Sequence, residues 1–109
     1  MAQPYHIELM KRGARDVTEW RKNLGGKERL DLSGADLSGM DLTEIDFTGG
    51  DLTGAVFDNA NISGALFHDA DLSGASFCGA VSHSVGRHVV FHNATMRNAK
   101  LNNSAVQRQ

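Results

Sequence analysis

The sequence predicts an all-β solenoid with a helical cap at its N-terminal end. Large apolar residues recur every five positions, without exception, between residues 32 and 77. A second residue, mostly small and apolar, stands two places before each of them, and Ser or Thr followed by Gly mostly comes after. A period of five fits neither an α-helix nor a straight strand. Each unit must therefore be a short extended piece followed by a bend.

The five-residue unit alternates large and small apolar side chains. The large ones, called centres below, are Leu32, Leu37, Leu42, Phe47, Leu52, Phe57, Ile62, Phe67, Leu72 and Phe77. Two residues before the centres stand Leu30, Ala35, Met40, Ile45, Gly50, Ala55, Ala60, Ala65, Ala70 and Ala75. A separation of two places both side chains on one side of an extended segment. A separation of three needs a corner, where Gly, Ser and Thr are favoured.

The units follow the pattern A-(D/N)-L-x-x. ADLSG occurs at 35–39 and 70–74, and ANISG occurs at 60–64. From about Leu30 to Val106 the chain therefore resembles the pentapeptide-repeat family. The resemblance implies a right-handed, quadrilateral β-helix with four units in each coil, and about four coils in this chain. The 20-residue spacing of Phe47 and Phe67, repeated by Phe57 and Phe77, agrees with that coil length.

The five-residue rhythm fails between residues 81 and 90, which read VSHSVGRHVV. Ser82 takes the next centre, and apolar centres resume at Phe91, Met96, Leu101 and Val106. The interval from Phe77 to Phe91 is one residue short of three units, so we expect one lost residue and an irregular corner. The predicted organisation is a cap at 1–27 and a β-helix at 28–109, with a register break at 81–90.

An amphipathic segment precedes the repeats. We expect a helix over Tyr5–Asn23, and Gly25-Gly26 provides a stop after it. The apolar residues of this segment and of the position after it follow helical spacing: Ile7, Met10, Ala14, Val17, Trp20 and Leu24. A stacked β-helix has open edges at its ends, and repeat proteins usually cap them. We expect one helix to cover the first coil, with Trp20 packed on it. We expect no such cap on the last coil, so that a partner covers it, a second copy stacks on it, or its polar residues make exposure to water tolerable: Asn102, Asn103, Gln107 and Arg108.

Charge is segregated along the chain, although the formal net charge is only -2. Residues 1–30 carry +3, residues 31–86 carry -9 without any Lys or Arg, and residues 87–109 carry +4. Most acids of the middle segment precede a centre and should point outward: Asp31, Asp36, Asp41, Asp46, Asp51 and Asp71. They suit the bend and keep the solenoid soluble. Alternatively they mimic DNA, as in the quinolone-resistance members of the family, which engage DNA gyrase. This chain is shorter than those proteins and has basic ends.

The sequence predicts no catalytic, cofactor or metal site. His68, His83, His88 and His92 fall on outward corners without Cys or carboxylate partners at ligand spacing, although His68 and His88 are one coil length apart and could stack. Cys78 follows a centre and has no basic neighbour in the sequence to activate its thiol. No nucleophile elbow or phosphate-binding loop is present. We therefore expect that the protein is not an enzyme.

The favoured hypothesis is a non-enzymatic protein-interaction or scaffold module with rigid faces. The alternatives are a DNA-mimicking binder of gyrase and a self-assembling unit, including an end-to-end homodimer through the last coil. A nearly balanced charge argues against direct binding of nucleic acid. A single cysteine, no signal peptide and no apolar run of about 20 residues favour a cytoplasmic protein without a membrane partner. The resemblance to the pentapeptide-repeat family, by itself, suggests a bacterial source.

Overall fold

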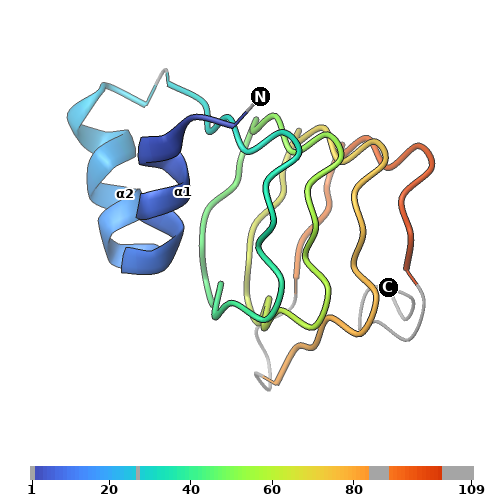
Figure 1. Cartoon of the computed structure of the whole chain (residues 1–109). Coiled ribbons are helices and arrows are strands. Elements are labelled where there is room, and N and C mark those ends of the chain that lie inside the picture. The colour runs from blue at the N-terminus through green and yellow to red at the C-terminus, as the bar shows by residue number, and fades with distance from the viewer. Residues whose placement is uncertain (1, 27, 84–88, 102–109) are drawn as a thin grey trace.

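Two short helices stand at one end of a stack of coils (Figure 1). The computed structural model describes residues 2–26, 28–83 and 89–101. Helix α1 spans Pro4–Arg12 and helix α2 spans Ala14–Asn23. In the described residues the coils pair through isolated parallel β-bridges rather than through long strands. None of the described helices is long and apolar enough to cross a membrane.

The cap consists of two helices, so the prediction of one helix over Tyr5–Asn23 was wrong. Gly13 separates them with φ 100° and ψ -177°, a backbone conformation that is essentially restricted to glycine. Its N–H donates to the carbonyl of Leu9 at 3.1 Å, and its own carbonyl accepts from Val17 N–H at 3.2 Å. One residue therefore ends α1 and begins α2. The apolar spacing continues across Gly13, which is why periodicity alone did not reveal the break.

The cap packs on the first coil, as the sequence predicted. Met10 and Val17 are buried, and Trp20 is partly buried against the core. Two details differ from the prediction. Leu9 is buried although it lies off the predicted apolar face, and Leu24 is 46% exposed although it was placed on that face. The turn at Gly13 gives each helix its own buried side, so one continuous stripe does not describe both.

Each coil has four short faces. The bridges join positions one coil length apart, such as Asp31 with Asp51 and Asp46 with Leu66, so four five-residue units close one coil. The N–H of Leu32 donates to the carbonyl of Asp51 at 2.9 Å, and Asp51 N–H donates back to the carbonyl of Leu30 at 2.8 Å. The same reciprocal pattern repeats from coil to coil, which satisfies backbone groups that a narrow solenoid would otherwise leave unpaired. The predicted 20-residue coil is confirmed.

The centres fill the interior in vertical columns. Every centre from Leu32 to Phe77 is fully buried. Phe47 stacks on Phe67 with ring centroids 4.7 Å apart, and Phe57 stacks on Phe77 at 4.6 Å. Rings of the two columns also meet edge to face, at 5.7 Å between Phe57 and Phe67. Aromatic contacts of both kinds add to the apolar area that each ring buries.

The register changes once, by insertion rather than by the loss of one residue. Leu66 bridges Val90, four positions beyond the coil length of the earlier bridges, and the two following bridges have the same longer spacing. The coil therefore contains four extra residues between the units at Val81 and Val90, and residues 84–88 lie outside the described part. The interval from Phe77 to Phe91 equals three units minus one residue, but it also equals two units plus four. The sequence count could not separate these cases, and the expected deletion was wrong.

After the insertion the coil resumes, as expected. The described residues contain two complete coils, a third with the insertion, and the first two faces of a fourth. Residues 102–109, which include the expected centre Val106, lie outside the described part. Phe91, Met96 and Leu101 are only partly buried, unlike the centres from Leu32 to Phe77.

Candidate interaction surfaces

The acidic residues that precede the centres close the bends. Asp71 Oδ1 accepts hydrogen bonds from the N–H of Ser73 at 3.0 Å and from its hydroxyl at 2.7 Å. Asn61 makes the same pair to Ser63 through its amide oxygen. The other acids with this arrangement are Asp31, Asp36, Asp41, Asp46 and Asp51. These acids therefore have a local structural role in the bend.

The same hydrogen bonds act on the ionisation of these acids. The Ser or Thr hydroxyl, followed by the backbone N–H of that residue, lowers the pKa of four of the carboxyl groups: Asp31, Asp36, Asp41 and Asp71. Hydrogen bonds to the charged form favour that form. The carboxylates are thus held ionised in the folded chain, with their charge directed to their own bend.

The six carboxylates that precede a centre form one ladder and one ring. The ladder runs up a single face through Asp31, Asp51 and Asp71, which bridge one another from coil to coil. The other three faces have an Asp before the centre only in the first coil: Asp36, Asp41 and Asp46. Above these, the corresponding positions are taken by Val56, Asn61 and Leu66. These six of the nine acids in residues 31–86 therefore do not present two parallel lines of charge like the backbones of duplex DNA.

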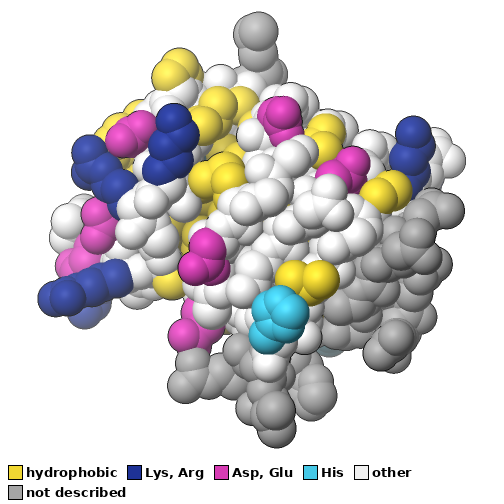
Figure 2. Space-filling model, turned by 60° about the horizontal axis from the view of Figure 1, so that its bottom comes forward, with side chains coloured by type: hydrophobic (Ala, Val, Ile, Leu, Met, Phe, Trp, Pro, Cys, Tyr) yellow, Lys and Arg dark blue, Asp and Glu magenta, His cyan; other side chains and the backbone are white. Residues whose placement is uncertain are grey.

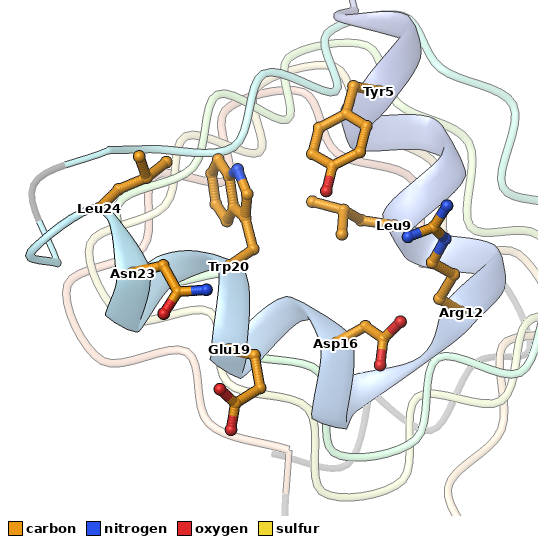
Figure 3. A pocket seen from close by; sticks show the side chains of 8 residues that line it. All are labelled: Tyr5, Leu9, Arg12, Asp16, Glu19, Trp20, Asn23 and Leu24. Atoms are coloured by element: carbon orange, nitrogen blue, oxygen red, sulfur yellow. The ribbon is translucent and has the colours of Figure 1, made fainter.

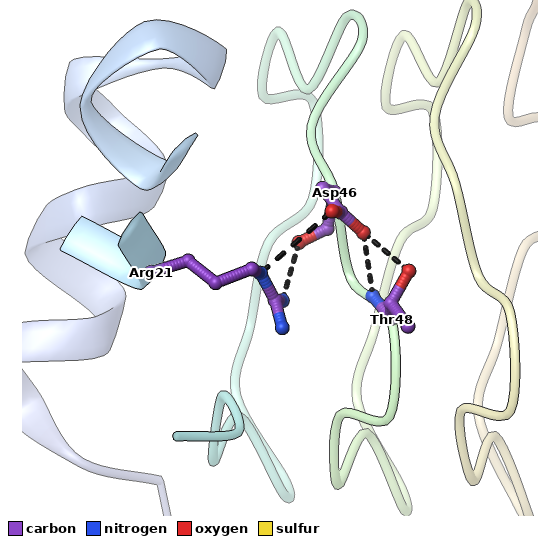
Figure 4. A network of polar contacts seen from close by, with 3 residues as sticks. All are labelled: Arg21, Asp46 and Thr48. Carbon is purple, nitrogen blue, oxygen red and sulfur yellow. Dashed lines mark hydrogen bonds and ion pairs between the residues drawn. The ribbon is translucent and has the colours of Figure 1, made fainter. Parts of the chain in front are cut away.

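The basic cap rests on the acidic ring of the first coil. Arg21 Nη2 of α2 donates to the carbonyl oxygen of Asp46 at 3.0 Å, and its Nε lies 3.7 Å from Asp46 Oδ2 (Figure 4). On another face, Asp31 N–H donates to His6 Nδ1 at 2.9 Å. Figure 2 shows Lys and Arg side chains gathered at the cap end, with another at the opposite end. Some of the segregated charges thus contribute to the contact between the cap and the first coil.

A groove of about 390 Å³ lies between α1 and α2 on the cap, with the coils behind it in Figure 3. Tyr5 and Leu9 enter it from α1, and Trp20 lines it from α2. Tyr5 is 51% exposed. Charged residues stand at its edge, including Asp16 and Glu19.

Two histidines meet on the outer surface of the second and third coils. The imidazoles of His68 and His92 have centroids 6.0 Å apart and planes at 67°. The sequence had placed His68 opposite His88, which lies outside the described residues, and the four-residue insertion brings His92 there instead. His83 is separate, and its backbone N–H donates to Ser63 Oγ at 2.7 Å. Where the structure describes the chain, no three His, Cys, Asp or Glu side chains gather in a metal-binding group.

Comparison with known proteins identifies the family. The family model for pentapeptide repeats, in eight copies, matches residues 31–69 and 46–81. A solved pentapeptide-repeat protein, alr5209 from Nostoc PCC 7120, is 24% identical over 84% of this chain and 74% of its own, with a TM-score of 0.51. The chain belongs to the pentapeptide-repeat family. Its fold is accordingly the pentapeptide-repeat β-helix, preceded by two helices.

Two further pentapeptide-repeat structures are similar in sequence. AT2G44920 from the Arabidopsis thaliana thylakoid lumen is 25% identical over 72% of this chain and 71% of its own, with a TM-score of 0.31. HetL from Nostoc, a protein involved in regulating heterocyst differentiation, is 28% identical over 68% of this chain and 41% of its own, with a TM-score of 0.30. No curated protein sequence matches the chain.

One unit of this pentapeptide-repeat chain replaces the usual bend contact. Ser76 stands where Asp is usual, so its own unit lacks the carboxylate that would accept from Cys78 N–H. Asp58 of the coil below accepts instead, from Cys78 N–H at 3.0 Å and from the Ser76 hydroxyl. The Ser76 hydroxyl also lies 3.4 Å from the Cys78 sulfur. A structural hydrogen bond between coils accounts for this cluster.

Proposed function

We propose that this pentapeptide-repeat chain is a non-enzymatic protein-interaction module. The observation that carries the proposal concerns the outward position before each centre, where the repeat usually places Asp. Four units place an apolar side chain there instead, each partly exposed: Val56, Leu66, Val81 and Val90. Leu66 and Val90 bridge each other, so they lie side by side on one face.

An outward apolar pair on a solenoid face has no role in the interior, which the centres already fill. Burial of apolar surface is the main driving force of protein association, and solenoids bind partners along their extended faces. The polar groups of the bends are already hydrogen-bonded within the chain, so these groups offer little chemistry for catalysis. A partner with a complementary apolar patch therefore fits the Leu66–Val90 face better than a small substrate does.

The test replaces the two apolar residues with Asp, the residue that the repeat usually has at this position. Leu66→Asp and Val90→Asp should keep the fold, because Asp46 occupies the same column and closes its own bend. Immobilised wild-type protein is expected to retain a partner from native cell extract that the double variant loses. Val56→Asp, on another face, is the matched control and should retain the partner. Equal capture by all three proteins, or no reproducible partner, would contradict the proposal.

Self-assembly is a second candidate, favoured by the last described coil. Phe91, Met96 and Leu101 are centres, yet they remain partly exposed at that end. A second copy that stacked on them would complete their burial and produce an end-to-end homodimer. Sedimentation over a range of concentrations should show a dimer that Met96→Lys weakens. A monomer at every concentration would reject this candidate.

The gyrase-directed alternative has less support. Its motive is the -9 segment, but the six of its nine acids that precede a centre are distributed as one ladder and one ring, with a basic cap against the ring. A supercoiling assay that shows inhibition at stoichiometric protein would favour it over the interaction module.

A cytoplasmic location stays part of the proposal, and it rests on the single cysteine, Cys78.

A further inference from the structure

The third coil brings two imidazoles together on the outer surface. His68 directly follows the centre Phe67, and His92 directly follows Phe91, which stacks on Phe67 with centroids 5.0 Å apart. The backbone between the two histidines is fixed as well, because Asp69 N–H donates to the carbonyl of His92 at 2.9 Å. The rings thus project from neighbouring rungs of a rigid column.

The distance between the rings suits a shared metal ion. A nitrogen ligand lies about 2.0–2.1 Å from zinc, so two imidazole centroids on one ion are about 5–6 Å apart once the rings are included. The observed centroid distance is 6.0 Å. Within the described residues, no hydrogen bond engages a ring nitrogen of either histidine. A metal ion bound there would therefore replace no hydrogen bond of the described residues at these nitrogens.

We propose that His68 and His92 form a two-imidazole binding site for a divalent transition-metal ion. Imidazole suits Cu²⁺, Ni²⁺ and Zn²⁺, and affinity rises toward Cu²⁺ in the Irving–Williams order. No third His, Cys, Asp or Glu of the described chain completes a cluster, so water fills the remaining coordination positions. The site is consequently open and moderate in affinity. It does not depend on the proposed protein partner.

Two properties follow from the chemistry of the ligands. Hard ions such as Mg²⁺ and Ca²⁺ prefer oxygen ligands, so this site discriminates against them. Imidazole binds a metal only in its neutral form, so protons compete with the ion and binding weakens on acidification. Because the ion binds a folded arrangement of two coils, it also raises the thermal unfolding temperature in proportion to the logarithm of its concentration.

Titration of the full-length protein with Cu²⁺ alone, followed by calorimetry and thermal unfolding, tests the site. We expect one bound ion per chain and a raised unfolding temperature. His68→Gln and His92→Gln should each weaken binding at least tenfold and abolish the temperature shift. His83→Gln is the matched control, because it removes an exposed imidazole from another corner and should leave both readouts unchanged.

A spectroscopic readout keeps the proposal testable if one variant folds poorly. Electron paramagnetic resonance of the copper-loaded wild type should show two imidazole nitrogens, and the exposed His92→Gln variant should not. Unchanged copper binding in both histidine variants would overturn the proposal. So would binding of Mg²⁺ at the same concentrations, or an equal loss in His83→Gln.

Discussion

The ring of Phe91 stacks on the ring of Phe67, with centroids 5.0 Å apart and planes within 2°, although the two lie further apart in the sequence than one regular coil. Phe67 in turn stacks on Phe47, which lies one regular coil earlier. One column of rings therefore continues through steps of unequal length. The burial of a large apolar centre sets the register of each coil, and the bend can absorb additional residues.

The position of Phe67 makes it the most connected centre, and its truncation should be severe. Its ring contacts four other phenylalanines and is fully buried: Phe47, Phe57, Phe77 and Phe91. Phe67→Ala is expected to lower the free energy of unfolding by about 3–5 kcal/mol, measured in urea. Phe91→Ala is the control, and it should cost less because that ring is only partly buried. Equal losses would contradict the column model.

The repeat could be predicted from the sequence because each five-residue unit has the same pattern of apolar and bend-forming residues. Leu32 to Phe77 specify the columns through period alone, and the Asp, Ser and Thr residues around them specify the bends. The break at Gly13 could not be predicted from apolar spacing, since a glycine inside a helical pattern is also tolerated as a helical residue. Only its φ of 100° distinguishes a turn from a weak helix position.

The surface sites were less predictable, since they depend on which coil lies against which. His92 faces His68 only because four residues are inserted after Val81. Asp58 serves Cys78 across a coil boundary, a contact that no rule within one unit contains. Both contacts follow once the bridges are known. Sequence spacing alone offered several registers of similar plausibility.

Gly13 should resist replacement. A side chain at φ 100° and ψ -177° is strained, and Gly13→Ala is expected to destabilise the protein by about 1–3 kcal/mol. No neighbouring atom would meet the added Cβ, so the loss would report backbone strain rather than a clash. Thermal unfolding followed by circular dichroism measures it. Arg15→Ala, on the exposed side of α2, should be nearly neutral, and a neutral Gly13→Ala would indicate that one continuous helix is also compatible with the coils.

The contact between Asp58 and Cys78 predicts that a second substitution can restore the stability lost in Asp58→Ala. Asp58→Ala removes the acceptor for Cys78 N–H and for the Ser76 hydroxyl, and should destabilise the protein by about 1–3 kcal/mol. Ser76→Asp places a carboxylate where Asp71 closes its own bend, so it should recover much of that loss in the double variant. Urea unfolding of the four proteins gives the coupling. Purely additive effects would mean that the two carboxylate positions do not substitute for each other.

The bend carboxylates predict a loss of stability in acid. Hydrogen bonds from Ser73 lower the pKa of Asp71 in the folded state, so folding favours the ionised form. That contribution is fully present above the ordinary Asp pKa of about 3.9, and it is lost as pH falls below this value toward the folded pKa. Asp71→Asn should therefore flatten the decline of stability below about pH 4. Asn61 already makes the same contact without titrating, so Asn61→Asp should steepen the decline, and unchanged profiles in both variants would contradict this account.

The register shift predicts that the chain tolerates a shorter third coil. Val81 and Val90 stand on consecutive faces, nine residues apart, where other units place five. Deleting four of the five residues 84–88 would restore the regular coil length while Val89 and Phe91 keep their columns. The free energy of unfolding should fall by less than about 1 kcal/mol or rise, because a shorter connection between paired units costs less entropy to close. If the chain had lost one residue from three units, removal of four would displace Phe91 from Phe67 and unfold the last coil, which urea unfolding would detect.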